Sequence, residues 1–119
     1  MNTTRCSTFW AKIYIAGDLN TIEQVCREWC MKGACVTVTP TNYIYTMGEE
    51  SGAEIGFIHY PRFAKDQTKV ATMETKKQIL ESAEELGQEL LEKCYQGSFT
   101  IMTPDDTFFF SRRSGDEKK

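Results

Sequence analysis

The first strand and the first helix are encoded in Trp10-Ala11-Lys12-Ile13-Tyr14-Ile15-Ala16-Gly17-Asp18-Leu19-Asn20. Residues 10–16 alternate in side-chain polarity and are rich in β-forming residues, which predicts a strand. Residues 17–19 turn the chain. Asn20 followed by Glu23 has the spacing of a capping box, so we expect a helix to begin at Asn20. This stretch therefore predicts a strand that leads directly into a helix.

The helix continues as an amphipathic stripe and has a clear end. Gly33 can adopt the left-handed conformation that stops a helix, and Lys32 is favourable near a helix C-terminus. The apolar residues share one face of the helix: Ile22, Val25, Cys26, Trp29 and Cys30. We therefore expect the first helix to pack this stripe on the sheet.

Short β-type segments follow the helix. Residues 35–39 and 43–46 are expected to form a hairpin around a turn at 40–42. Residues 48–52 are expected to form a polar, glycine-flanked loop. A further strand is predicted over 53–60. It is expected to end there because Pro61 has no N–H to donate to a neighbouring strand.

The second half has a long helix and a final hairpin. The helix is expected over 71–95, with Gly97 closing it. Gly87 is a weak point, costing about 1 kcal/mol relative to alanine unless a neighbour packs against it. Strands are expected over 99–103 and 107–111.

The two halves echo each other. Val36-Thr37-Val38-Thr39-Pro40 is matched by Thr100-Ile101-Met102-Thr103-Pro104, and each follows a helix. One interpretation is a duplicated β-α-β-β unit with both helices on one face of a joint sheet; the other is that Thr-Pro turns are common. The predicted fold class is α+β, with about six strands in an antiparallel or mixed sheet and two helices.

Length and composition suit one domain covering residues 1–119, with flexible ends at 1–8 and 114–119. The formal charge of −3 argues against binding long nucleic acids. No apolar run approaches the roughly 18–20 residues that span a bilayer. The five cysteines and the polar N-terminal residues indicate reduced thiols in a cytoplasm.

The sequence contains no recognisable catalytic apparatus. Cys26 and Cys30 could be neighbours on a helix, but His59 is the single histidine, so we expect no metal and no cofactor. A cysteine nucleophile with His59 as its base lacks a family signature. The acidic pairs 49–50 and 105–106 are interpreted as solvated turn residues rather than acid–base groups.

Aromatic and basic residues are more informative. Residues 108–110 are three consecutive phenylalanines, which cannot all face one core because strand side chains alternate. An exposed phenylalanine predicts a homodimer or a higher homo-oligomer. Aromatic rings beside arginines at strand ends also suit a nucleotide, with its base on a ring and its phosphate on a guanidinium. The alternative is that the aromatics are core and interface and that the arginines are solvated.

Several segments resemble a small family of bacteriophage-encoded proteins. They are Ile13-Tyr14-Ile15-Ala16-Gly17-Asp18, Cys35-Val36-Thr37-Val38-Thr39-Pro40-Thr41, Tyr45-Thr46 before the Gly-Glu-Glu-Ser-Gly stretch, and His59-Tyr60-Pro61-Arg62-Phe63. The resemblance runs from about residue 11 to residue 113 and is identified with the phage anti-Thoeris sponge family. It implies a non-enzymatic protein that sequesters a cyclic ADP-ribose-type immune signal.

The sequence thus predicts a phage counter-defence protein that binds a small cyclic nucleotide without cleaving it. Direct inhibition of a host immune protein and a small nucleotide-processing enzyme are the alternatives. Side-chain chemistry alone gives the candidate contacts. Phosphates would be bound by Arg62, Arg112 and Arg113, a base by Phe63, Tyr60 or Phe99, and base or ribose edges by Asn42, Thr103 or Asp105.

Overall fold

A computed structural model describes residues 1–58 and 73–112 of the chain. The elements are β1 (Trp10–Ala16), α1 (Leu19–Cys30), β2 (Thr37–Tyr45), β3 (Gly48–Ile58), α2 (Met73–Lys93), β4 (Ser98–Met102) and β5 (Thr107–Ser111). The predicted α+β class with two helices is confirmed, and the described sheet has five strands where about six were expected.

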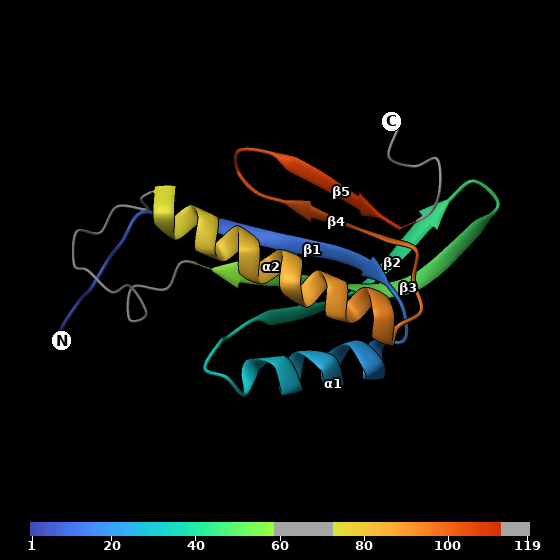
Figure 1. Ribbon diagram of the computed structural model, residues 1–119, viewed down its shortest axis with the longest axis horizontal. Helices are drawn as coiled ribbons and strands as arrows, with labels where there is room; N and C mark the ends of the chain where they lie inside the picture. The colour runs from blue at the N-terminus through green and yellow to red at the C-terminus, as the bar shows by residue number, and fades with distance from the viewer. Residues whose placement is uncertain (59–72, 113–119) are drawn as a thin grey trace.

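The strands lie in the order β2-β3-β1-β4-β5, and every neighbouring pair is antiparallel. Two β-α-β halves, β1-α1-β2 and β3-α2-β4, are interleaved so that their first strands pair at the centre. This is the split arrangement of ferredoxin-like proteins, with β5 added at one edge. Both helices cover the same face of the sheet (Figure 1), as the duplicated-unit interpretation expected.

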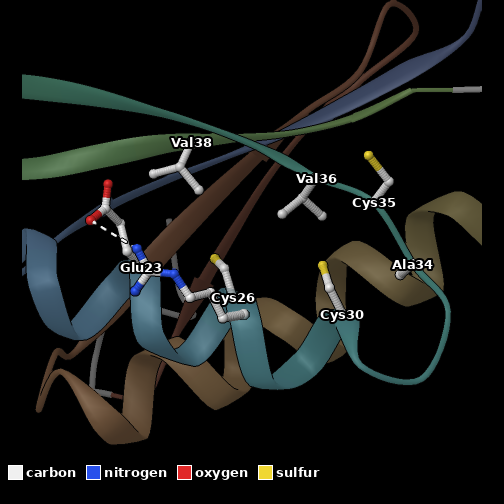
Figure 2. A pocket seen from close by; sticks show the side chains of 8 residues that line it. Glu23, Cys26, Cys30, Ala34, Cys35, Val36 and Val38 are labelled. Atoms are coloured by element: carbon white, nitrogen blue, oxygen red, sulfur yellow. Dashed lines mark ion pairs between the residues drawn. The ribbon is translucent and has the colours of Figure 1, made fainter.

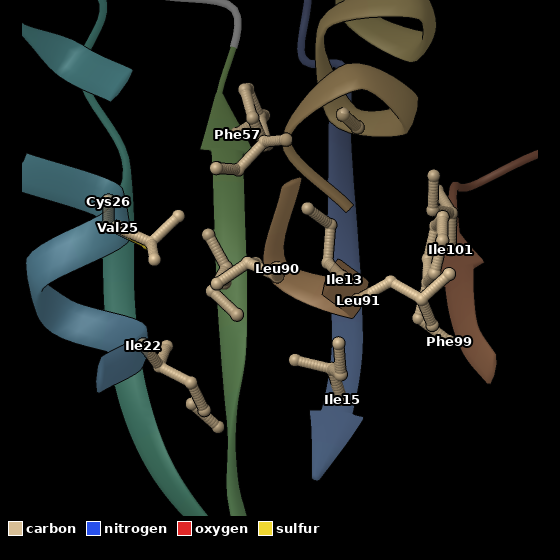
Figure 3. Close-up of a cluster of buried hydrophobic side chains, with 14 of the residues drawn as sticks. Ile13, Ile15, Ile22, Val25, Cys26, Phe57, Leu90, Leu91, Phe99 and Ile101 are labelled. Carbon is tan, nitrogen blue, oxygen red and sulfur yellow. The ribbon is translucent and has the colours of Figure 1, made fainter. Parts of the chain in front are cut away.

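The core lies between the sheet and the helices. Along β1, Ala11, Ile13 and Ile15 are buried while the residues between them are half-buried. Ile13 pairs with Ile55 on β3 and with Ile101 on β4, and all three side chains are fully buried. Figure 3 shows Ile13 and Ile101 together with apolar side chains of both helices. The alternation of β1 therefore decides which face of the sheet is the core.

The expected hairpin over residues 35–46 is wrong. Residues 37–45 form one continuous strand, β2, with Pro40 inside it. β2 is an edge strand, so a residue without an N–H can be accommodated there. Because the two expected strands are one strand in the structure, the described sheet has one strand fewer than expected.

The expected loop over residues 48–52 is also wrong, because these residues begin β3. β2 and β3 form a long hairpin whose two-residue turn is Thr46-Met47, with Tyr45 paired to Gly48. Met47 has a φ of 68° and a fully exposed side chain. The expected loop began at Gly48, whereas the chain turns at residues 46–47.

Both helices differ slightly from expectation at one end. Asp18, rather than Asn20, caps α1, and its carboxylate accepts from the Thr21 N–H at 2.9 Å. At the end of α2, Tyr95 rather than Gly97 takes the left-handed conformation, with a φ of 55°. The Gln96 N–H then donates to the Leu91 carbonyl at 2.9 Å, so Tyr95 occupies the usual glycine position of a Schellman cap.

Gly87 is required by packing. A Cβ built at this position would lie 2.3 Å from Cε2 of Phe99, whose side chain is 3% exposed. The Phe99 ring also stacks on Phe110, with 4.8 Å between the ring centroids. The glycine therefore makes room for the aromatic pair beneath α2.

We predict that Gly87→Ala destabilises the protein by about 1–3 kcal/mol because the added methyl group would overpack the Phe99 ring. Helix propensity alone predicts the opposite, a gain of about 1 kcal/mol. Denaturant unfolding of the variant checks the sign. Lys77→Ala, at an exposed position of the same helix, is the control and should be nearly neutral.

A polar cluster joins the two helices. Glu85 of α2 accepts from Nε1 of Trp29 at 3.0 Å and also pairs with Nζ of Lys32. Lys32 lies 4.0 Å above the centre of the Trp29 ring, and that ring meets Phe57 edge-on. The hydrogen bonds from Lys32 and Trp29 lower the pKa of the Glu85 carboxyl below its ordinary value.

This lowered pKa predicts a pH dependence. A carboxyl whose pKa is lower in the folded chain stabilises the fold above its unfolded pKa, and that contribution is lost as pH falls through the folded pKa. Glu85→Gln should therefore lower the unfolding midpoint at neutral pH, and the difference from wild type should vanish in acid. A difference that stays constant with pH would contradict the assignment.

The sheet face opposite the helices carries exposed apolar side chains. Phe108 and Phe110 pack against the core, so Phe109 points to the other face and is 53% exposed. Met102 and Ile58 are also exposed. The alternation predicted for the three phenylalanines is thus observed.

No helix in the described part of the chain is both long and apolar enough to cross a bilayer.

The expected homo-oligomer stays a prediction, and this open face is its candidate interface. Light scattering should give a mass at least twice the 13.6 kDa of one chain. Phe109→Ser should shift the mass towards the monomer, because burial of an apolar ring drives association. Tyr95→Ser removes a ring that is 89% exposed at the end of α2 and is the matched control.

Candidate functional site

The candidate site lies on the open face of the sheet, where the β2–β3 hairpin leaves it. A hollow of about 310 Å³ is bounded there by β1, the hairpin and the segment that enters β4. Its polar side chains are Tyr14, Tyr43, Glu50, Gln96, Ser98 and Thr100. We call this the tyrosine hollow. Its volume is at the lower end of the range for small-molecule sites.

Tyr43 is positioned by a glycine on the neighbouring strand. A Cβ built at Gly52 would lie 2.9 Å from Cε2 of Tyr43 and 2.2 Å from the Ile15 carbonyl oxygen. Without that side chain, the Tyr43 ring lies across the strand, and its hydroxyl donates to the Ala53 carbonyl at 2.8 Å. Tyr43 therefore forms a fixed wall of the hollow.

Tyr45 and Gly48 repeat this arrangement nearer the hairpin tip. A Cβ at Gly48 would lie 2.8 Å from Cε2 of Tyr45. The Tyr45 hydroxyl donates to Oε1 of Glu50 at 3.0 Å. Because Glu50 is directly opposite Tyr43 in the strand register, Tyr45 holds its carboxylate beside the Tyr43 wall.

The two hairpin tyrosines remain phenols at neutral pH. Burial raises the pKa of Tyr43 to about 12, although the Ile15 backbone N–H opposes the shift. The hydrogen bond to Glu50 raises the pKa of Tyr45. Neither hydroxyl can act readily as a base. The rings therefore serve as walls and the hydroxyls as hydrogen-bonding groups.

The charge of the hollow favours a cationic ligand. Glu50 is its charged side chain, and no lysine or arginine is among the described residues that line it. A cation is attracted both by a carboxylate and by the face of a tyrosine ring. Lys12, on the same strand as Tyr14, does not line the hollow and pairs with Glu54 at 3.1 Å. The hollow is thus poorly suited to phosphates.

A second hollow, of about 310 Å³, lies between the end of α2 and the last hairpin, and we call it the arginine hollow. Arg112 and Phe99 border it together with Phe110, Gln88 and Glu92. Two of the contacts expected from the sequence therefore meet here. Phe99 is too deeply buried to offer its ring face, since Phe110 is stacked on it.

The other predicted contacts in the described residues lie apart. Asn42 donates to Glu49 at 3.3 Å in the hairpin and lines neither the tyrosine nor the arginine hollow. The Thr103 hydroxyl accepts from the N–H of Asp105 and Asp106 and closes the β4–β5 turn. That turn is at the opposite end of β4 from Ser98 and the tyrosine hollow.

Asp105 pairs with Lys76 of α2 at 3.7 Å. The remaining predicted contacts, Tyr60, Arg62, Phe63 and Arg113, lie outside the described residues, so the predicted site as a whole stays a prediction.

Sequence reasoning missed Tyr14, Tyr43 and Glu50. The expected loop over residues 48–52 leaves Glu50 unpaired, whereas in the structure it lies opposite Tyr43. The available signal was the pattern Tyr43-x-Tyr45 followed by Gly48-x-Glu50-x-Gly52, in which small residues face aromatic ones across a hairpin.

The expected metal-free state also stays a prediction. Within residues 1–58 and 73–112, no three His, Cys, Asp or Glu residues are grouped so that they could hold a metal ion.

Two solved structures share the fold. A phage SAM lyase in complex with S-methyl-5'-thioadenosine matches with a TM-score of 0.58 and 16% identity over 98% of both chains. A phage SAM lyase in its apo state matches with a TM-score of 0.56 and 15% identity over 88% of this chain and 90% of that chain. No family model matches the sequence, and neither does any curated protein.

These matches correct two predictions. Both neighbours are lyases and therefore enzymes, which opposes the prediction of a non-enzymatic protein that only sequesters its ligand. The neighbours are phage proteins and one holds a small nucleoside, as the coarser prediction of a phage protein with a nucleotide-like ligand expected. Neither is described as an anti-Thoeris protein, and neither carries a cyclic nucleotide.

Proposed function

We propose that this protein is a phage enzyme that acts on S-adenosylmethionine (SAM) as a lyase and releases S-methyl-5'-thioadenosine. The observation that carries the proposal is the shared fold over 98% of both chains with a SAM lyase that holds this nucleoside. The charge of the tyrosine hollow adds support, because SAM carries a sulfonium cation and no phosphate.

The chemistry of SAM explains why few catalytic groups would be needed. S-methyl-5'-thioadenosine keeps the sulfur, its methyl group and the adenosine, so the broken bond joins the sulfur to the amino-acid chain. The bonding electron pair leaves with the sulfur, which becomes a neutral thioether. No acid is required to protonate this leaving group.

Two routes can break that bond without water. In the first, the carboxylate of the substrate attacks the carbon attached to sulfur and closes a lactone. In the second, a base removes a proton from the next carbon and an alkene forms. Tyr43 and Tyr45 are phenols and poor bases, so elimination would require Glu50 to remove the proton. The first route needs no base from the protein, and we favour it for that reason.

We assign roles to three of the side chains that line the tyrosine hollow. Tyr14 and Tyr43 would contact the sulfonium and the adenine through their rings. Glu50 would accept hydrogen bonds from the ribose hydroxyls or the substrate ammonium. Excluding water from carboxylate and sulfonium favours a reaction in which their charges cancel. The protein would act mainly by orienting and desolvating SAM.

The test incubates the purified protein with SAM and analyses the products by mass spectrometry. We expect S-methyl-5'-thioadenosine together with a four-carbon lactone. An unsaturated amino acid would indicate elimination instead. If a folded protein returns only intact SAM, the proposed function is wrong.

Glu50→Gln should lower kcat/KM about tenfold to a hundredfold, since a hydrogen bond to a charged group contributes roughly 1.5–3 kcal/mol. Arg112→Ala is the matched variant for the arginine hollow and should leave kcat/KM unchanged. The reverse result would place the substrate in the arginine hollow. The unfolding midpoints of both variants control for misfolding. Because Glu50→Gln is purified in the same way as wild type, its loss of activity also excludes a contaminating enzyme.

A further inference from the structure

A third hollow, separate from the candidate site, is lined by thiols. It has a volume of about 350 Å³ and lies between α1 and the segment that enters β2. Cys26, Cys30 and Cys35 border it, with Val36 and Val38 on the strand side. We call it the thiol hollow. It shares no lining residue with the tyrosine hollow.

Figure 2 shows that Cys26 and Cys30 direct their sulfur atoms from the helix towards the strand. Cys35 lies on the incoming segment above Cys30 with its sulfur directed away from the helix, so its side chain must rotate to meet Cys30. The three thiols differ in access to solvent: Cys26 is buried, Cys30 is half-buried and Cys35 is exposed. An oxidant dissolved in water would therefore reach Cys35 first.

The turn after α1 brings Cys35 back to Cys30. The N–H groups of Gly33 and Ala34 both donate to the Cys30 carbonyl, at 3.0 and 3.3 Å, and Gly33 has a φ of 106°. The backbone N–H of Val36 donates to the sulfur of Cys30. This contact places the Cys30 sulfur beside the backbone that joins Cys35 to Val36.

Cys26 is a poorer partner for Cys30. Residues four apart on a helix have Cβ atoms about 5–6 Å apart, whereas a disulfide needs about 3.5–4.5 Å. The backbone hydrogen bonds of α1 resist the shift that would close this gap. Cys35 precedes the first residue of β2 and lies outside any helix or strand, so its backbone can adjust.

We propose that Cys30 and Cys35 form a redox-sensitive pair that becomes a disulfide on reaction with a two-electron oxidant such as hydrogen peroxide. The Cys35 thiolate attacks the peroxide, the O–O bond breaks, and one hydroxide leaves, which gives a sulfenic acid at Cys35. The Cys30 sulfur then attacks the Cys35 sulfur and displaces water after proton transfer. In total, two thiols and one peroxide give one disulfide and two waters.

The environment sets the order of these steps. Burial raises the pKa of the Cys30 thiol, so Cys30 is a weak first nucleophile but can attack the Cys35 sulfur once that sulfur has been oxidised and has turned towards it. The raised pKa of Cys26, about 12, likewise keeps that thiol protonated and inert. Cys35 is oxidised first because it is exposed, and Cys30 then attacks the oxidised sulfur to form the disulfide.

A Cys30–Cys35 bond would constrain the segment that carries Lys32. This lysine pairs with Glu85 of α2 and lies over the Trp29 ring, so the disulfide would close a short covalent loop that includes Lys32. A closed loop restricts the unfolded chain and raises resistance to unfolding. The pair is independent of the proposed lyase activity.

The experiment treats the reduced, folded protein with graded hydrogen peroxide and then blocks the remaining thiols. Intact mass should show a loss of two hydrogens, and peptide mapping should give a Cys30–Cys35 cross-link. The unfolding midpoint should rise on oxidation and return to its starting value with a reductant. Cys30→Ser and Cys35→Ser should each abolish the cross-link and the rise.

The matched controls are Cys26→Ser and Cys94→Ser, which should both keep the cross-link. A cross-link that maps to Cys26, or that survives in Cys35→Ser, would overturn the proposal. So would stepwise oxygen addition at Cys35 without a disulfide. Repeating the reaction in denaturant should scramble the pairing, which shows whether the folded turn selects the partner.

Discussion

The antiparallel pairing of β1 with β3 is the contact on which the rest of the structure depends. It places Ile13 against Ile55 and so directs the alternate residues of both strands towards the helices. A slip of one residue would turn these isoleucines to the open face and bring Lys12 and Tyr14 inside. The same pairing sets Gly52 opposite Ala16, at the position that Tyr43 must cross to wall the candidate site.

Small residues decide where the large rings of this protein can lie. Gly52 and Gly48 leave room for Tyr43 and Tyr45 on the hairpin, and Gly87 leaves room for Phe99 beneath α2. In a sheet or a helix a glycine is normally unfavourable because it lacks a side chain and has more backbone freedom to lose. Here the loss is offset by the ring that fills the space.

A site built from two phenols and a carboxylate is consistent with the proposed reaction. SAM carries its own leaving group, a sulfonium, and its own nucleophile, a carboxylate, so orientation and desolvation can replace acid–base groups. On the proposed function, this would explain why the sequence carries no recognisable catalytic motif although the chain shares its fold with two phage SAM lyases. The thiol hollow lies on the helix side of β2, and oxidation there need not disturb the tyrosine hollow.

The sequence by itself determined the α+β class, the two helices and the strands β1, β4 and β5, because their periodicity records which face is buried. It also determined that residues 108–110 cannot share one face. Tertiary structure alone decided that Pro40 lies inside β2, since only the edge position makes a missing N–H acceptable. It likewise decided that residues 48–52 are strand, because their pairing with β2 outweighs a loop-like composition. The candidate site follows from that pairing: Tyr43 and Glu50 become neighbours only when the register of the hairpin is set.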